Sequence, residues 1–121
     1  HDETRRWDAL RRHALANGML EILVQWRSER SRPASQQSSD TLHAFQSKVA
    51  SGLSAADARA AATTSAVDIG HVTLGVVLGY LDFRYADIDW RARHVRLAHW
   101  FESFKARASM KNTLHKDERA S

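Results

Sequence analysis

The chain has 121 residues, enough for one domain with a hydrophobic core but not for two. It contains no cysteine, which excludes disulfides, thiolate metal sites and cysteine nucleophiles. Its formal net charge is +4, but the arginines are scattered from Arg5 to Arg119 with acids among them. Because no compact basic cluster with interleaved aromatic residues is formed, nucleic acid is not an expected partner.

The first predicted element is an unusually long helix from about Glu3 to Arg32. Apolar or small residues recur along it at steps of three and four, which is the spacing of a helix face. They are Trp7, Leu10, Ala14 and Gly18 in one row and Leu15, Met19, Ile22 and Trp26 in another. Pro33 stops this helix, and the polar stretch 33–39 is predicted to be a linker.

A second helix is predicted to begin at Ser39 or Asp40, since either residue can cap a first turn. Its inward face has the same helical spacing as the first: Leu42, Phe45, Val49, Leu53 and Ala56. The alanine-rich end of this helix leads into a small loop at 63–65.

The third helix, predicted over 68–84, is the expected centre of the fold. Asp68 is a good N-cap, because its carboxylate can accept the free N–H groups of the first turn. No residue between Val72 and Leu81 is charged, so the helix is expected to have no fully solvated face.

Two further features of this helix concern its neighbours. Gly75 and Gly79 lie one turn apart on the same face and are predicted to form a notch for the close approach of another helix. The apolar run is shorter than the roughly 20 residues that span a bilayer, so no membrane association is expected.

A turn-rich connection, 85–91, is predicted after Arg84, with Ile88 and Trp90 tucked under the bundle. A fourth helix follows over 93–107, with an inward face made by Leu97, Trp100, Phe101 and Phe104. Ser109 is expected to cap one short last turn, and 115–121 to be a frayed tail. The predicted fold is therefore an all-α helical bundle with a long first helix and a buried central helix.

No self-contained catalytic or metal-binding constellation is visible, so no catalytic residue and no metal are predicted in this chain. The seven histidines include no pair at i and i+4 and have no acidic residue at ligand spacing. Three carboxylates, Asp82, Asp87 and Asp89, are expected to lie in a turn, where capping and solvation explain them.

Four local patterns together resemble the C-terminal helical domain of bacterial soluble glutathione transferases. They are Ala16-Asn17-Gly18 with Arg32-Pro33 at the end of the first helix, Asp68-Ile69-Gly70-His71 running into the segment 78–84, Asp89-Trp90-Arg91, and Arg107-Ala108-Ser109-Met110. The second pattern is the most specific. The resemblance spans nearly the whole chain, 1–121, as a single domain.

The sequence departs from the family in three respects. The family's capping box has Ser or Thr at the cap and Asp three residues on, whereas this chain has Asp68 and His71, so the reciprocal carboxylate bond is expected to be lost. Ala108 replaces the usual proline. The family's thiol-activating residue belongs to an N-terminal thioredoxin-like domain, which is absent here, so the chain is expected to be the second half of the enzyme.

The resemblance implies a function for this half. In the family, the helical domain supplies a wall of the electrophile pocket, contacts to glutathione as co-substrate, and much of a homodimer interface. It implies glutathione contacts at Arg12, His13 and Asn17, and electrophile contacts at Ala16 and Tyr80. The whole protein is then expected to conjugate glutathione to small electrophiles in the cytoplasm.

Each of these residues has an alternative structural interpretation. Tyr80 fits a helix core, Asn17 beside Gly18 fits close helix packing, and His13 fits a solvated helix position. Asp68 and His71 are predicted to be a structural cap, with His71 taking the place of the capping-box acid and neutral near pH 7. The alternative for the whole chain is a non-catalytic protein-interaction module of the same fold.

Overall fold

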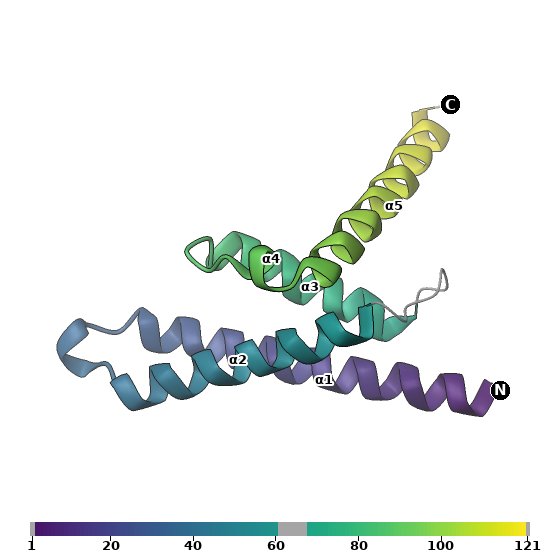
Figure 1. Ribbon diagram of the computed structural model, residues 1–121. Coiled ribbons are helices and arrows are strands. Elements are labelled where there is room, and N and C mark those ends of the chain that lie inside the picture. The colour runs from purple at the N-terminus through teal and green to yellow at the C-terminus, as the bar shows by residue number, and fades with distance from the viewer. Residues whose placement is uncertain (1, 61–67, 121) are drawn as a thin grey trace.

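The computed structural model describes the backbone of residues 2–60 and 68–120 and the side chains of residues 3–60 and 68–108. Within these ranges the chain is helical throughout its regular structure and has no strand (Figure 1). The predicted all-α fold is therefore confirmed. No helix in the described ranges is long and apolar enough to cross a membrane.

The first two helices form an antiparallel pair (Figure 1). Helices α1 (Asp2–Arg30) and α2 (Ser39–Ala60) pack side by side and are joined around a short 3-10 turn, η1 (Ala34–Gln36). Helix α1 ends before Pro33, because the residue preceding a proline disfavours helical backbone. The predicted start and end of α1 and the predicted start of α2 are thus correct to within two residues.

Helix α3 (Ile69–Arg84) is central, because it packs against both α1 and α5. Its inner side contributes four residues to the core: Leu74, Val77, Leu78 and Leu81. The prediction that it has no solvated face is wrong, since one apolar stripe is 45–74% exposed: Ile69, Val72, Val76 and Phe83. This stripe is apolar because it carries no charged residue, but the helices described in this chain pack against the other faces of α3 and leave it uncovered.

The glycines of α3 show where neighbours approach. A Cβ on Gly75 would lie 2.5 Å from the Phe104 ring, whereas a Cβ on Gly79 would meet nothing within 4 Å. Only the first half of the predicted notch therefore admits a neighbour. At Gly70 it is the backbone of α1 that approaches, since a Cβ there would lie 2.6 Å from the Cβ of Arg12 and 2.9 Å from the backbone nitrogen of His13.

The end of the chain is simpler than predicted. A short helix, α4 (Trp90–Arg93), leads into one continuous helix, α5 (Val95–Ala120). The prediction of a separate last turn capped by Ser109 is wrong, because Ala108 keeps its N–H and favours helix where a proline would break it. The frayed tail stays a prediction, and the predicted loop at 63–65 lies outside the described residues.

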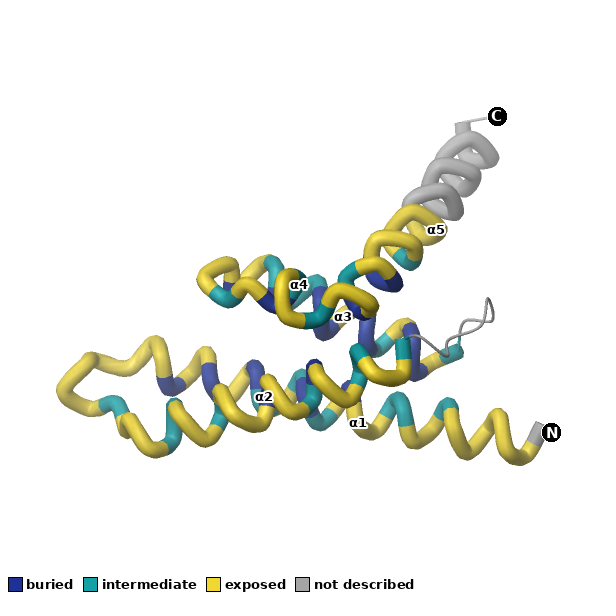
Figure 2. Tube along the Cα trace, in the orientation of Figure 1, coloured by how far each residue is buried: buried dark blue, intermediate teal, exposed yellow. Residues whose placement is uncertain are grey.

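The core lies where the middle of α1, the second half of α2, the inner side of α3 and the start of α5 meet (Figure 2). The inward faces predicted for the second and fourth helices are confirmed, with Val49, Leu53, Leu97 and Phe101 all at most 3% exposed. The connection after α3 contributes the buried Tyr85, whose hydroxyl donates to the carbonyl oxygen of Leu23. In contrast, the first turns of α1 extend beyond the core, where Trp7 is 66% exposed.

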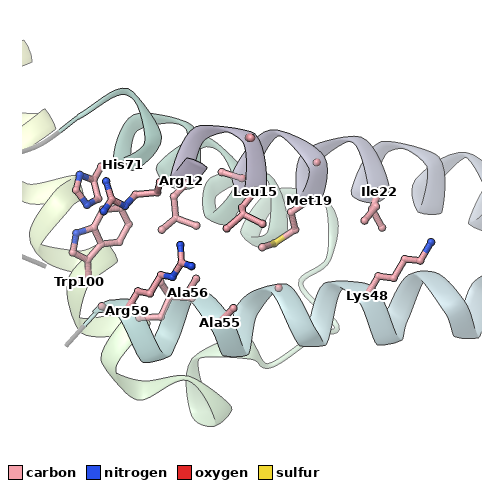
Figure 3. Close-up of a pocket in the computed structure, with 17 residues that line it drawn as sticks. Arg12, Leu15, Met19, Ile22, Lys48, Ala55, Ala56, Arg59, His71 and Trp100 are labelled. Carbon is pink, nitrogen blue, oxygen red and sulfur yellow. The ribbon is translucent and has the colours of Figure 1, made fainter. Parts of the chain in front are cut away.

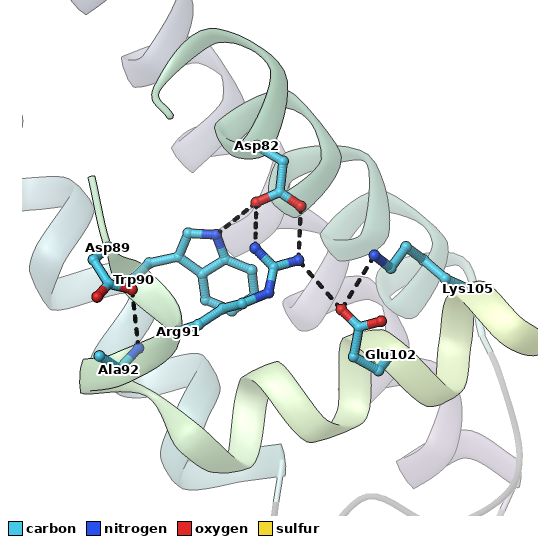
Figure 4. Close-up of polar contacts among 7 residues, drawn as sticks. All are labelled: Asp82, Asp89, Trp90, Arg91, Ala92, Glu102 and Lys105. Carbon is cyan, nitrogen blue, oxygen red and sulfur yellow. Dashed lines mark hydrogen bonds and ion pairs between the residues drawn. The ribbon is translucent and has the colours of Figure 1, made fainter. Parts of the chain in front are cut away.

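A polar network joins the end of α3 to α4 and α5 (Figure 4). The Asp82 carboxylate accepts the Trp90 indole N–H at 3.0 Å and two bonds from the Arg91 guanidinium, at 2.7 and 2.8 Å. Arg91 also donates to Glu102 at 3.3 Å. Asp82 was expected in a turn but lies inside α3, where its carboxylate is held by this bidentate ion pair. Asp89 does cap the next helix, α4.

Candidate functional site

Asp68 caps α3, as predicted, and forms a complete capping box with His71. The Asp68 carboxylate accepts the backbone N–H of His71 at 3.0 Å. In return, the His71 Nδ1 accepts the backbone N–H of Asp68 at 3.1 Å. The expected loss of the reciprocal bond is therefore wrong, because an imidazole nitrogen reaches the same N–H that a carboxylate at this position would accept.

The surroundings of His71 favour its neutral form. Burial lowers the pKa of the imidazole, and the charges of Arg12 and Arg107 act in the same direction, against the carboxylate of Asp68. Since Nδ1 accepts a hydrogen bond, the neutral ring carries its proton on Nε2. That Nε2 is buried and has no partner among the described residues.

The middle of α1 is held tightly against the start of α3. The Arg12 guanidinium forms an ion pair with the Asp68 carboxylate, and the His13 Nδ1 lies 2.8 Å from the Thr73 hydroxyl. Burial acts to raise the pKa of Asp68, but the N–H of His71 and the guanidinium of Arg12 outweigh it and hold the pKa below its ordinary value. Both α1 residues therefore support the helix crossing at Gly70.

A cavity of about 320 Å³ lies between α1 and α2, beside the starts of α3 and α5 (Figure 3). Its walls are mainly apolar and include Leu15, Met19, Ile22, Ala55, Ala56 and Trp100. Three cations, Arg12, Lys48 and Arg59, also line it, and no acidic residue does among the part of the chain that is described. Figure 3 places His71, Arg12 and Trp100 at one end and Lys48 with Ile22 at the other.

The residues implied by the family resemblance do not all meet in this cavity. Arg12 and Ala16 line it, whereas His13, Asn17 and Tyr80 do not. Ala16 is only 3% exposed, and Asn17 lies on the exposed side of α1, one turn from His13. Tyr80 is partly buried against the core, with its ring centroid 6.2 Å from that of Tyr85.

Several residues of the cavity were not found from the sequence. Lys48 and Arg59 were not singled out from the sequence, and Trp100 was predicted only as a core residue. Helical spacing identifies which side chains face inward. It does not show whether the inward side chains of two helices fill the space between them, which depends on how the helices cross. The available signal was the row of small residues opposite α1: Gly52, Ala55, Ala56 and Ala60.

Metal binding has no candidate residues in the described structure. No group of three or more His, Cys, Asp or Glu side chains lies together within the ranges where side chains are described. The carboxylates of Asp68 and Asp82 are instead committed to a helix cap and to an ion pair.

Comparison with known proteins identifies the family. The sequence-family model of the glutathione S-transferase C-terminal domain matches residues 24–103. A family member from Pseudomonas fluorescens Pf-5, solved with bound S-(propanoic acid)-glutathione, is 34% identical with a TM-score of 0.81. That similarity covers 89% of this chain and 56% of the other. The chain therefore belongs to the glutathione transferase family and has the fold of its C-terminal helical domain.

Two further bacterial glutathione transferases have similar structures. The protein from Methylobacterium radiotolerans JCM 2831, in complex with glutathione sulfonate, is 29% identical with a TM-score of 0.76, over 86% of this chain and 51% of that one. The protein from Methylobacillus flagellatus KT, with glutathione bound, is 29% identical with a TM-score of 0.78, over 87% and 54%. This chain spans about half the length of these structures. A comparison with curated protein sequences finds no match.

Proposed function

We propose that this domain forms a wall of the electrophile pocket and part of the homodimer interface in a cytoplasmic glutathione transferase. The whole enzyme conjugates glutathione to electrophilic small molecules, and a thioredoxin-like half activates the thiol. One observation carries the proposal: the chain is 34% identical, over 89% of its length, to a protein whose structure holds a glutathione derivative.

The exposed stripe of α3 supports the presence of a second half. Ile69, Val72, Val76 and Phe83 form a contiguous apolar face on the central helix, and contiguous apolar faces of this kind mark interaction sites. A thioredoxin-like domain packed here would bury the stripe and bring glutathione beside the middle of α1.

The proposed glutathione contacts lie on or near that side of α1. His13 bonds to Thr73, the neighbour of the exposed Val72, and Asn17 follows His13 by one turn. Arg12 can reach a glutathione carboxylate only by sharing its guanidinium with Asp68. For the electrophile, Tyr80 lies one turn after the exposed Val76, while the small Ala16 leaves room at the centre of α1.

The test uses the natural gene product that carries this domain. We expect it to conjugate glutathione to 1-chloro-2,4-dinitrobenzene, followed by the absorbance of the product. In the variant Asn17→Ala, the KM for glutathione should rise several-fold, because a contact made to bound glutathione is lost. Gln25→Ala, another exposed amide on α1, is the matched control and should behave as wild type.

The alternative is a non-catalytic interaction module, and the same apolar stripe favours it, since a partner protein could cover this face instead. The intact mass of the natural gene product separates the two. A product without a thioredoxin-like half, inactive toward the electrophile, would support the module. A product with that half but no conjugation would be assayed for glutathione-dependent peroxide reduction and disulfide exchange.

A further inference from the structure

Thr73 is a polar residue on the same face of α3 as the exposed apolar stripe, since it follows Ile69 by four residues and precedes Val76 by three. Its hydroxyl makes two contacts. One is 2.9 Å long and reaches the backbone carbonyl oxygen of Ile69, and the other is 2.8 Å long and reaches Nδ1 of His13 in α1. Thr73 therefore connects the stripe to one of the proposed glutathione contacts.

The protons in these two contacts determine the tautomer of His13. A carbonyl oxygen can only accept, so the hydroxyl proton of Thr73 is directed to Ile69. The separation of 2.8 Å between Nδ1 and the hydroxyl oxygen also requires a proton between the two atoms, and Thr73 has no second proton to give. Nδ1 of His13 is therefore the donor, and the hydroxyl of Thr73 accepts.

The other ring nitrogen of His13 then has a defined character. With its proton on Nδ1, the neutral imidazole presents Nε2 as a hydrogen-bond acceptor. This Nε2 makes no hydrogen bond to any residue whose side chain is described. Without the contact to Thr73, either nitrogen of the ring could carry the proton, and Nε2 would be a donor for part of the time.

The character of Nε2 decides which part of glutathione His13 can meet. Glutathione carries N–H donors in its amides and its ammonium group, and acceptors in its carboxylates. A neutral ring with a bare Nε2 pairs with an N–H and has nothing to donate to a carboxylate. The guanidinium of Arg12, the residue before His13, is already paired with Asp68 and does not change this selection.

We propose, on the basis of the proposed function, that Thr73 is a positioning residue for glutathione binding. Its hydroxyl holds His13 in the tautomer with the proton on Nδ1, and Nε2 then accepts an N–H of glutathione. Thr73 itself acts through His13 and does not need to touch the ligand.

The first test observes the tautomer and does not depend on glutathione. The natural gene product, labelled with ¹⁵N in histidine, is studied by NMR at about pH 8, where an ordinary imidazole is neutral. Long-range ¹H–¹⁵N correlations show which ring nitrogen carries the proton, and His13→Asn identifies the signals of His13. We expect the proton on Nδ1 in wild type and at least partly on Nε2 in Thr73→Val. A wild-type ring protonated on Nε2, or the same tautomer in both proteins, would overturn the proposal.

The second test measures the affinity for S-methylglutathione by isothermal titration calorimetry, because this thioether keeps the N–H groups of glutathione but cannot react. We expect Thr73→Val to bind about threefold or more weaker than wild type, and Thr73→Ser, which restores a hydroxyl, to bind within about twofold of it. Thr41→Val is the matched control, because Thr41 lies in α2, outside the contact between α1 and α3, and it should bind as wild type. Equal affinities of Thr73→Val and wild type would contradict the positioning role.

The conjugation assay separates this inference from the proposed function. Thr73→Val should raise the KM for glutathione and leave kcat within about twofold, since the contact is made equally in the bound substrate and the transition state. An active wild-type enzyme with no effect of Thr73→Val would remove the inference and leave the proposed function standing. A wild-type protein that neither binds S-methylglutathione nor conjugates would remove both.

Two variants of His13 keep the test decisive if Thr73→Val does not fold. In His13→Gln, the side-chain oxygen can reach the region of Nε2 and accept an N–H there, whereas the shorter side chain in His13→Asn cannot. We expect His13→Gln to bind S-methylglutathione about threefold tighter than His13→Asn. Equal binding by the two variants would contradict an acceptor at this position.

Discussion

The carboxylate of Asp57 in α2 accepts the backbone N–H of Leu97 in the first turn of α5, at 2.8 Å. The two residues are 40 positions apart, so α5 is capped by a side chain of another helix. Arg96 adds a bond to the second oxygen at 3.2 Å. Burial acts to raise the pKa of Asp57, but these bonds outweigh it and lower the pKa.

Removing this cap should destabilise the packing of α5 on α2. We expect Asp57→Ala to lower the free energy of unfolding by about 1–2 kcal/mol, the usual cost of losing an N-cap acceptor, measured by urea denaturation. Asp87→Ala is the control, because the ion pair of Asp87 with Arg30 is exposed and should contribute less than about 1 kcal/mol. Equal losses in the two variants would contradict the capping role of Asp57.

The cap of α3 should matter at least as much. Asp68→Ala removes the acceptor for the N–H of His71 and the ion pair with Arg12, and we expect a loss of about 1–2 kcal/mol in thermal unfolding. Asp68→Asn keeps the cap acceptor but not the charge, so it should lose only part of this stability. A melting midpoint that does not change in Asp68→Ala would show that the cap does not stabilise α3.

The stability of the protein should depend on His71 in mildly acidic solution. Its folded-state pKa is lowered from the ordinary value of 6.5, so between these two values the unfolded chain binds a proton that the folded chain does not. The contribution of neutral His71 to the free energy of unfolding is complete above about pH 6.5. It is lost as the pH falls through the lower pKa of the folded protein. Urea denaturation between pH 7.5 and 5 should show this loss in wild type and a shallower dependence in His71→Gln. The same pH dependence in both proteins would contradict the assignment.

Two glycine-to-alanine substitutions should have opposite effects. Gly70→Ala forces a methyl group against Arg12 and the backbone of His13, and we expect it to cost about 1–3 kcal/mol. Gly18→Ala places its methyl in open space inside a helix, so it should stabilise by about 1 kcal/mol. Differential scanning calorimetry of the two variants beside wild type measures both. A stabilising Gly70→Ala would mean that α1 and α3 do not cross closely there.

The local features of the fold follow from short-range chemistry and were predictable. Helical spacing identified the inward faces around Val49 and Leu97, and the carboxylate of Asp68 marked the start of α3, because each depends only on residues within one or two turns. The end of α5 was mispredicted for a local reason too, since the capping ability of Ser109 was given more weight than the helix-compatible Ala108.

The remaining features depend on contacts between distant segments. Nothing near Asp57 in the sequence indicates that it meets Leu97, and the apolar character of Val76 does not reveal which helices cover it. The bond from the N–H of Asp68 to His71 is local, but it was missed because the capping-box acceptor was expected to be a carboxylate. The cavity arises from how two inward faces fit together, which periodicity does not contain.

The packing of α3 on α1 also has a consequence for the order of folding. Helices α1 and α2 are joined by a connection of a few residues, so their pairing closes a short loop, whereas Arg12 and Asp68 are 56 positions apart. Contacts between residues far apart in sequence form slowly, so the docking of α3 should be the late, slow step of folding. Substitutions at the α1–α2 interface, such as Val49→Ala, should then slow folding, while Leu78→Ala in α3 should mainly accelerate unfolding.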